Sequence, residues 1–307
     1  MEFLFGPVPS RRLGLSLGIN IIPHKTCNYN CVYCEVGKTT NLTNQRQSFY
    51  NIEDIKKDFI EHVDKVGKFD FITFSGSGEP TLNKDLGELI RFVKSFNRAK
   101  IAVLTNGSLL YLEDVRHDLY EADVVIPSLD AAQEAAFKRI NQPHKELNLK
   151  NIIEGLKLFV REFKGEVWLE IVFAKGINDK DQDIEALKKA IEYIGPKKVQ
   201  IGTIERPPAF RGIEKLSNDK LMHIYMALKD YNVELIKPFS DKNVNFKEFL
   251  EKSIIKMISI RPCSVEELAD VFDTERKDIY NIVSQLINKE KAFKKNFGNK
   301  EFISARK

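Results

Sequence analysis

Three of the chain's four cysteines, Cys27, Cys31 and Cys34, fall within eight residues of the segment KTCNYNCVYCEVG. Asn28 and Asn30 make this segment polar, so it is predicted to be a loop, and buried structural cysteines are disfavoured there. A redox pair of the C-x2-C type would use the second and third cysteines but would leave the first unexplained. The clustering therefore indicates a site that needs all three thiols.

Two kinds of metal site compete for these thiols. Structural zinc takes four ligands, and the nearest additional ligand, His24, gives a spacing that is unusual for zinc, while Cys263 is distant in the chain. A four-iron cluster normally takes four thiolates, and three would leave one iron with open coordination positions, as catalysis at a metal requires. We therefore favour an iron–sulfur cluster over zinc.

The length and composition of the sequence are those expected of a cytosolic protein. The 307 residues can form one large domain and one small one, and 43% apolar with 30% charged residues is ordinary for a globular protein. No apolar run reaches the roughly 18 residues of a membrane span, and the first residues lack a signal-peptide pattern. In a reducing compartment, clustered cysteines are ligands or catalysts more often than disulfides.

Six apolar, β-branched segments alternate with amphipathic segments of helical spacing, which predicts an α/β fold of parallel strands joined by helical crossovers. The predicted strands are 16–22, 69–75, 101–106, 123–129, 167–173 and 199–204, and the predicted helices are 52–66, 84–96, 112–122, 149–163 and 184–194.

Polar or glycine-rich residues follow each predicted strand. The cysteines follow the first, and the later strands are followed by SGSGEP, TNG, SLD, GIND and ERPPAFRG. Because the carboxyl ends of parallel strands meet at one edge, we expect these residues to form one site.

The sequence changes character near residue 240. Ser264 and Glu267 form a capping box, an apolar stripe over 279–287 marks another helix, and KKNFGNKEFIS resembles two short strands around a turn. Residues 241–307 are therefore predicted to be a winged-helix domain, and Cys263 a buried filler within it. Its basic last segment suits contact with RNA phosphates, while contact with protein is the alternative.

The segment CNYNCVYC, with Tyr33 before the third cysteine, resembles the signature of the radical S-adenosylmethionine (radical SAM) superfamily. SGEP is similar to the Gly-Gly-Glu-Pro segment of that family, with Ser77 in place of the first glycine. The resemblance covers residues 1–240. The stretches FGPVPSRRLG and RINQPH are most similar to a poorly characterised group of Fe–S oxidoreductases, distantly related to wyosine-forming tRNA enzymes.

This resemblance implies a partial (β/α)6 barrel that binds a [4Fe–4S] cluster and S-adenosyl-L-methionine. The bound cofactor would be cleaved reductively to a 5′-deoxyadenosyl radical, which abstracts hydrogen from an unidentified substrate, with RNA as the favoured class. A one-electron donor such as a flavodoxin or ferredoxin is implied, and no membrane partner is expected. The implied cluster ligands are Cys27, Cys31 and Cys34, and the implied cofactor contacts are Tyr33, Gly76, Ser77, Gly78, Glu79, Asn106, Ser128 and Asp130.

Several polar residues carry weaker predictions. Glu170 lies within an apolar strand and points either into the barrel or to a solvated edge. Arg11 and Arg12 would bind an anionic substrate group or form ordinary ion pairs, and Arg206 and Arg211 raise the same question. No catalytic side chain is assigned.

Two other functions remain open. One is radical modification of a peptide, protein or small metabolite. The other, of a different class, is an Fe–S redox-sensing regulator that binds DNA through the C-terminal domain. The regulator needs no cofactor pocket, so the polar edge formed around SGSGEP argues against it.

Overall fold

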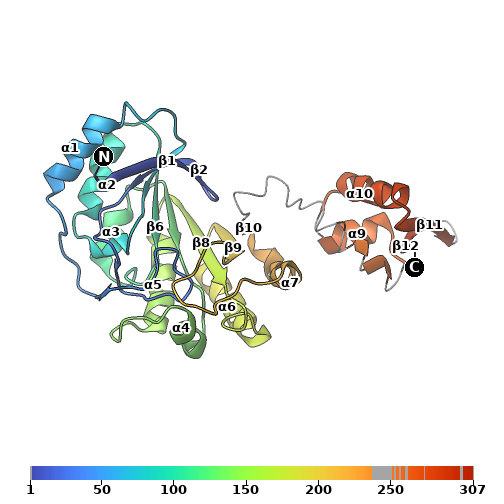
Figure 1. Ribbon diagram of the computed structural model, residues 1–307. Helices are drawn as coiled ribbons and strands as arrows, with labels where there is room; N and C mark the ends of the chain where they lie inside the picture. Colours follow the sequence, from blue (N-terminus) through green and yellow to red (C-terminus); the bar gives the residue numbers. More distant parts are fainter. Residues whose placement is uncertain are drawn as a thin grey trace. The chain divides into compact units, whose positions relative to one another are not determined.

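The computed structural model describes residues 2–236 and, in the C-terminal part, 251, 254–255, 257–259, 262–272, 274–297 and 300–306. The chain divides into two compact units, Met1–Phe239 and Ser240–Lys307, and each is described by itself (Figure 1).

The first unit is built on an eight-stranded sheet with the order β1-β2-β5-β6-β7-β8-β9-β10. Only β1 and β2 pair in antiparallel fashion, and every other neighbouring pair is parallel. The strands are β1 (Leu4–Ser10), β2 (Gly14–Ile19), β5 (Phe71–Phe74), β6 (Lys100–Thr105), β7 (Val124–Pro127), β8 (Glu166–Phe173), β9 (Lys198–Thr203) and β10 (Val233–Leu235). The protein thus has a mixed α/β fold with a mostly parallel sheet, and all six predicted strands are present in chain order.

The sequence analysis did not predict the two outer strands. Strand β1 contains Pro7 and Pro9, and proline normally counts against a strand because it cannot donate to the ladder. Strand β10 has only three residues, too few for a periodic pattern.

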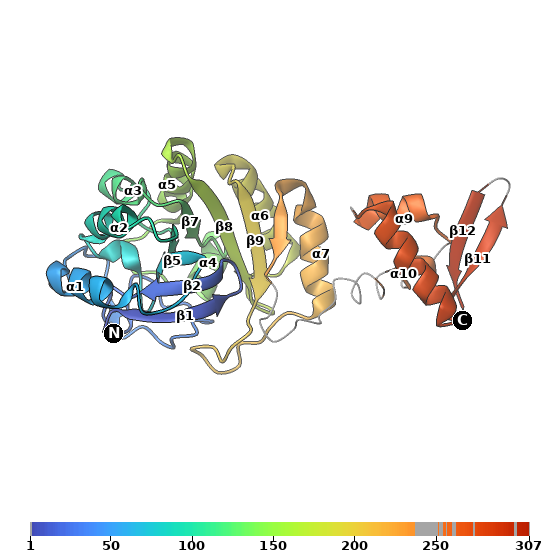
Figure 2. The same ribbon diagram turned by 90° about the horizontal axis from the view of Figure 1, so that it is seen from above.

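Helices connect the parallel strands, and α2, α3, α5 and α6 lie along one side of the curved sheet (Figure 2). The five predicted helices are α1 (Ile52–His62), α2 (Leu86–Ser95), α3 (Glu113–Leu119), α5 (Leu149–Glu162) and α6 (Asp181–Ile194). Two further helices, α4 (Glu134–Ile140) and α7 (Asn218–Leu228), were not predicted. The unit also contains two short 3-10 turns, η1 (Pro80–Leu82) and η2 (Lys229–Tyr231).

Both faces of the sheet are buried, which explains the nearly continuous apolar strands. Ile72, Phe74 and Val103 belong to the large cluster that includes the helical residues Phe59 and Phe159. A smaller cluster contains Leu13, Ala102, Val124 and Ile126. The rigid sheet that results fixes the strand ends from which the site is built.

The second unit contains α9 (Val265–Phe272), α10 (Arg276–Asn288) and the antiparallel hairpin of β11 (Ala292–Phe297) and β12 (Lys300–Ala305). The predicted capping box is confirmed, since the Ser264 N–H donates to Glu267 Oε2 at 2.9 Å and the Glu267 N–H donates to Ser264 Oγ at 3.1 Å. Cys263 is buried in the core of this unit and pairs with Ile303.

Residues 237–250, 252–253, 256 and 260–261 lie outside the described residues, so the winged-helix assignment stays a prediction. In the part of the chain that is described, no helix is long and apolar enough to cross a membrane.

Candidate functional site

The three cysteines lie on a loop whose two ends are tied together. Short strands β3 (Thr26–Cys27) and β4 (Asn41–Leu42) pair in parallel at these ends. The carbonyl of Lys25 accepts hydrogen bonds from the N–H groups of Thr40 and Asn41, at 3.3 and 3.1 Å. Closing the loop in this way holds three free, half-buried thiols in one small region.

Amide groups from other parts of the sheet donate hydrogen bonds to two of the sulfurs. Asn106 Nδ2 lies 3.6 Å from Cys27 Sγ, and Asn141 Nδ2 lies 3.4 Å from Cys31 Sγ. Hydrogen bonds to sulfur are one means by which proteins tune Fe–S clusters. Two sulfurs are therefore oriented by residues from distant segments.

Burial disfavours a bare thiolate at Cys27 and at Cys31. It raises the pKa of Cys27 to about 12, with the charge of Glu79 as the next cause, and burial also raises the pKa of Cys31 well above 9.0. Metal coordination removes the proton from a thiol outright. The donor set of three neighbouring sulfurs fits a cluster. Within residues 2–236 and the described C-terminal segments, no group of three His, Cys, Asp or Glu side chains is arranged to hold a single metal ion.

The glycine-rich loop after β5 packs directly against the residues that precede the first cysteine. A Cβ on Gly78 would lie 1.9 Å from the carbonyl oxygen of Thr26, so only glycine fits there. The Glu79 N–H donates to the same oxygen at 3.1 Å, and the Lys25 N–H donates to the carbonyl of Ser77 at 2.8 Å. Gly76 has a φ of +146°, which also favours glycine. The predicted residues 76–79 thus lie beside the cysteine loop.

The buried carboxylate of Glu79 is bound by its own chain. Its Oε1 accepts hydrogen bonds from the Thr81 N–H, the Thr81 hydroxyl and the Thr105 hydroxyl, at 3.0, 2.6 and 2.5 Å, and its Oε2 accepts from the Asn106 N–H at 2.7 Å. Four such bonds match the usual capacity of a carboxylate. Glu79 therefore joins the ends of β5 and β6, and its contact with the cofactor stays a prediction.

Asp130 has a similar linking role at the other side of the cysteine loop. Its Oδ2 accepts from the Tyr33 hydroxyl and from Asn141 Nδ2, both at 2.6 Å, and its Oδ1 accepts from the Val172 N–H at 2.9 Å. Burial raises the pKa of Asp130 to about 6. Asp130 and Asn106, both implied cofactor contacts, are thus hydrogen-bonded to protein groups in this structure, and their contact with the cofactor remains a prediction.

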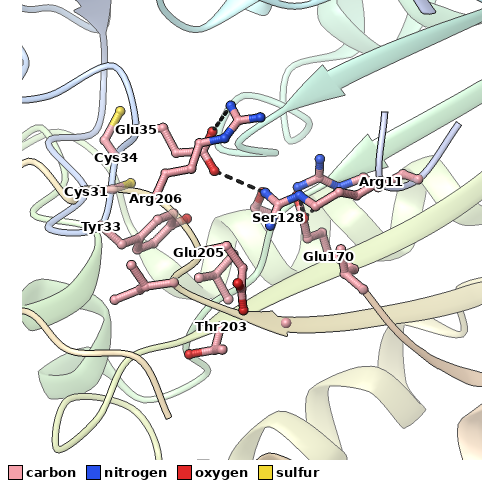
Figure 3. Close-up of a pocket in the computed structure, with 15 residues that line it drawn as sticks. Arg11, Cys31, Tyr33, Cys34, Glu35, Ser128, Glu170, Thr203, Glu205 and Arg206 are labelled. Atoms are coloured by element: carbon pink, nitrogen blue, oxygen red, sulfur yellow. Dashed lines mark hydrogen bonds and ion pairs between the residues drawn. The ribbon is translucent and has the colours of Figure 1, made fainter. Parts of the chain in front are cut away.

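A cavity of about 250 Å³ opens beside Cys31 and Cys34 (Figure 3). Tyr33 and the predicted residue Ser128 line it, as do the ends of β8 and β9. Figure 3 shows side chains from the cysteine loop and from the strand ends pointing into this space. The cavity therefore places room for a substrate directly next to two of the predicted cluster ligands.

Charged side chains at the cavity are largely paired. Arg12 donates to Glu170 Oε1, with Nε at 2.7 Å. Two orientations were predicted for Glu170, toward the interior or toward a solvated edge, and the structure shows the interior one. The carboxylate of Glu35 bridges Arg11 and Arg206, at 3.0 and 2.7 Å. Three of the four arginines considered from sequence meet here, whereas Arg211 is exposed and does not line the cavity.

Sequence reasoning missed three residues that support the site. Asn141 bridges Cys31 and Asp130, Asn28 accepts from Asn106 Nδ2 at 2.7 Å, and Glu35 holds two arginines. Two of them lie in segments that carry the family resemblance, Asn28 in CNYNCVYC and Asn141 in RINQPH, and could have been found there.

The parallel sheet, with a three-cysteine loop and a glycine loop at one edge, defines an α/β protein built to hold a cysteine-ligated cluster. A model of the radical SAM superfamily matches residues 21–187. A UPF0026 protein of Methanocaldococcus jannaschii is 35% identical over 308 residues, covering 98% of this chain and 95% of that protein. The chain belongs to the radical SAM superfamily, whose members bind a [4Fe–4S] cluster and S-adenosylmethionine, and it is a radical SAM enzyme.

Two further comparisons add detail. A protein named GTPase Obg of Brachyspira hyodysenteriae is 37% identical over 303 residues, which is 94% of this chain but only 43% of that protein. The crystal structure of Streptococcus suis SuiB bound to S-adenosylmethionine matches with a TM-score of 0.55 at 16% identity, over 76% of this chain and 54% of that one. This structural likeness supports the fold.

Proposed function

We propose that this enzyme acts on a substrate whose reacting group enters the cavity of about 250 Å³ beside Cys31 and Cys34. The observation that carries the proposal is that two of the three cysteines form one wall of this cavity. The bound cluster and S-adenosylmethionine would supply a 5′-deoxyadenosyl radical by reductive cleavage. We further propose that β2 and β5–β9 form the partial (β/α)6 barrel around this chemistry.

The chain's own residues have distinct roles in this proposal. Cys27, Cys31 and Cys34 hold the cluster. The backbone at Gly76 and Gly78 lets a ligand approach closely, because neither residue has a side chain in the way. The hydrogen bond that the Tyr33 hydroxyl donates to Asp130 Oδ2 holds the Tyr33 ring at the wall of the cavity.

Formation of 5′-deoxyadenosine tests the activity. The full-length protein is reconstituted anaerobically with iron and sulfide, reduced and mixed with S-adenosylmethionine, and 5′-deoxyadenosine is measured by mass spectrometry. We expect product from the native chain and from Cys263→Ala, which removes the cysteine of the second unit, and none from Cys27→Ala. Absence of product from a native chain that holds its cluster would contradict the proposal.

We also propose that the second unit is a winged-helix domain that contacts RNA. Arg276, Lys277, Lys291 and Lys295 form no ion pair with another described residue, so their charges are available to phosphate. A groove beside α9 and α10 is lined by Glu266, Glu267, Asp270 and Glu301, together with Arg276 and Lys277. The acidic groove disfavours phosphate, so we propose that Lys291, directly before β11, and Lys295 of β11 carry the contact.

A peptide or a small metabolite is the second candidate substrate. The cavity of about 250 Å³ could admit a base or an amino-acid side chain, so its size does not separate the candidates. The DNA-binding regulator is distinguished from an enzyme by its response to S-adenosylmethionine. A regulator with a sensor cluster would bind DNA without needing that cofactor.

A further inference from the structure

The side chain of Lys25 is buried against the cysteine loop, and none of the described residues forms a hydrogen bond with its ammonium. The residue is 8% exposed, and its Nζ has no hydrogen bond with any described residue. An ammonium that leaves water normally gains a counter-charge, because an unpaired buried charge is strongly unfavourable. An isolated cation at this position therefore requires an explanation.

The ammonium of Lys25 lies against Gly37. A Cβ on Gly37 would lie 2.7 Å from Lys25 Nζ, so the ammonium rests against the backbone just after the third cysteine. Lys25 itself comes two residues before Cys27, and its backbone is tied to Asn41 and to Ser77. The backbone of Lys25 thus lies where the two ends of the cysteine loop meet, and its ammonium lies against Gly37 within that loop.

The carboxylates of the site are committed to other groups. Glu35 bridges Arg11 and Arg206. Glu79 accepts from the ends of β5 and β6, and Asp130 accepts from Tyr33, Asn141 and the Val172 N–H. None of them forms a hydrogen bond or ion pair with Lys25, and no other described residue hydrogen-bonds its Nζ, so the missing counter-charge is absent from the described part of the chain.

A bound cluster would provide that counter-charge. A [4Fe–4S] core of charge 2+ with three thiolates carries one net negative charge, and one-electron reduction adds a second. A nearby fixed cation attracts the reduced state more strongly than the oxidised state, so it raises the reduction potential. We propose that Lys25 is the buried counter-charge of the cluster and favours its reduction, an inference that rests on the proposed function.

A redox titration monitored by electron paramagnetic resonance (EPR) tests this proposal on the full-length protein. The variants are Lys25→Met, which removes the charge at similar volume, and Lys25→Arg, which keeps it. Lys38→Met is the matched control, because Lys38 lies on the same loop but with its Nζ 4.6 Å from the centre of the Phe210 ring. Iron and sulfide content are measured first for each protein.

We expect Lys25→Met to titrate at a more negative potential. At a fixed potential, the ratio of reduced to oxidised cluster falls on the order of tenfold, the effect of one charge at roughly 10 Å in a medium of dielectric about 20. Lys25→Arg and Lys38→Met stay near the native value. An unchanged potential for Lys25→Met, or equal shifts for both methionine variants, would overturn the proposal.

Thermal unfolding of the cluster-free proteins gives a second test that does not require cluster uptake. Without the cluster, Lys25→Met should be at least as stable as the native chain, because it removes an uncompensated buried charge. Lower stability of cluster-free Lys25→Met would reveal a partner within the chain and contradict the proposal. A native chain that takes up no cluster would instead count against the proposed function.

Discussion

Single residues support the cysteine loop by making two contacts at once. Asn141 donates both to Cys31 Sγ and to the buried carboxylate of Asp130, and Asn106 donates both to Cys27 Sγ and to Asn28. Loss of one such amide therefore removes one donor from a sulfur and one from a second acceptor. Buried acceptors that lose a donor are costly.

Asn141→Ala tests this dual support. The change should lower the free energy of unfolding by about 1–3 kcal/mol, because Asp130 keeps its burial but loses a donor. It should also speed the loss of iron from the reconstituted protein, measured by the decay of cluster absorbance in the presence of a chelator. Asn151→Ala, at an exposed position of α5, is the control and should change neither quantity appreciably. Equal behaviour of both variants would refute the supporting role.

Gly78→Ala tests the close approach of the glycine loop. The new methyl group would lie 1.9 Å from the Thr26 carbonyl oxygen, a backbone atom that cannot move alone. We expect about 1–3 kcal/mol of destabilisation and a lower iron content after reconstitution. The comparison is Gly202→Ala, whose Cβ would meet Ile236 at an ordinary 3.4 Å. Native-like stability and iron content in Gly78→Ala would show that the loop has room to spare.

Among the elements, the β1–β2 hairpin brings two arginines to the cavity. Its start is anchored by Asp58 of α1, whose Oδ2 accepts from the N–H groups of Glu2, Phe3 and Leu4, at 2.9, 2.8 and 3.3 Å. Its turn carries Arg11 and Arg12, which reach Glu35 and Glu170. The hairpin thus connects Asp58 on α1, which holds its start, to the cavity wall formed by Arg11 and Arg12.

Asp58→Asn should weaken this anchor in a pH-dependent way. Burial opposes ionisation of Asp58, but the three backbone N–H groups outweigh it and lower the pKa from its ordinary 3.8. A lowered pKa means that the ionised group stabilises the folded state above pH 3.8, and that this stabilisation disappears as the pH falls through the lowered value. We expect a loss of about 1–2 kcal/mol at pH 7 that shrinks in acid, measured by urea unfolding across pH.

The exposed Asp54 of the same helix supplies the control for this pH dependence. Asp54→Asn should change stability little at any pH. A stability difference for Asp58→Asn that stays constant from pH 7 to below pH 3 would contradict the anchoring role.

The elements were predictable from sequence where burial imposes a simple pattern. The strand at 123–129 is apolar on both faces, and α5 has a regular apolar stripe. The contact of Asn106 with Cys27 joins residues 79 positions apart, and it depends on which strands are neighbours. Local spacing therefore predicted the cysteines and glycines, but the partners of Asn106, Asp130 and Glu170 became apparent only from the assembled sheet.

At the scale of the whole molecule, the two units have separable roles in the proposed function. The first unit holds the cysteine loop and cavity, and the second carries the lysines proposed to meet RNA. The full-length double variant Lys291→Glu with Lys295→Glu should bind a labelled tRNA pool at least tenfold more weakly in fluorescence anisotropy, with a shallower salt dependence. Its formation of 5′-deoxyadenosine without RNA should remain native-like. Unaltered tRNA binding would favour a protein, peptide or metabolite partner.

The most direct test of the account is the EPR spectrum of the reduced native protein, recorded before and after addition of S-adenosylmethionine. We predict the signal of a reduced [4Fe–4S] cluster whose g-values change with the cofactor, because three cysteine ligands leave one iron open to it. The same protein with Cys34→Ala should give no such change. A cluster signal that S-adenosylmethionine leaves unaltered would contradict an open iron at Cys27, Cys31 and Cys34, and with it the central claim.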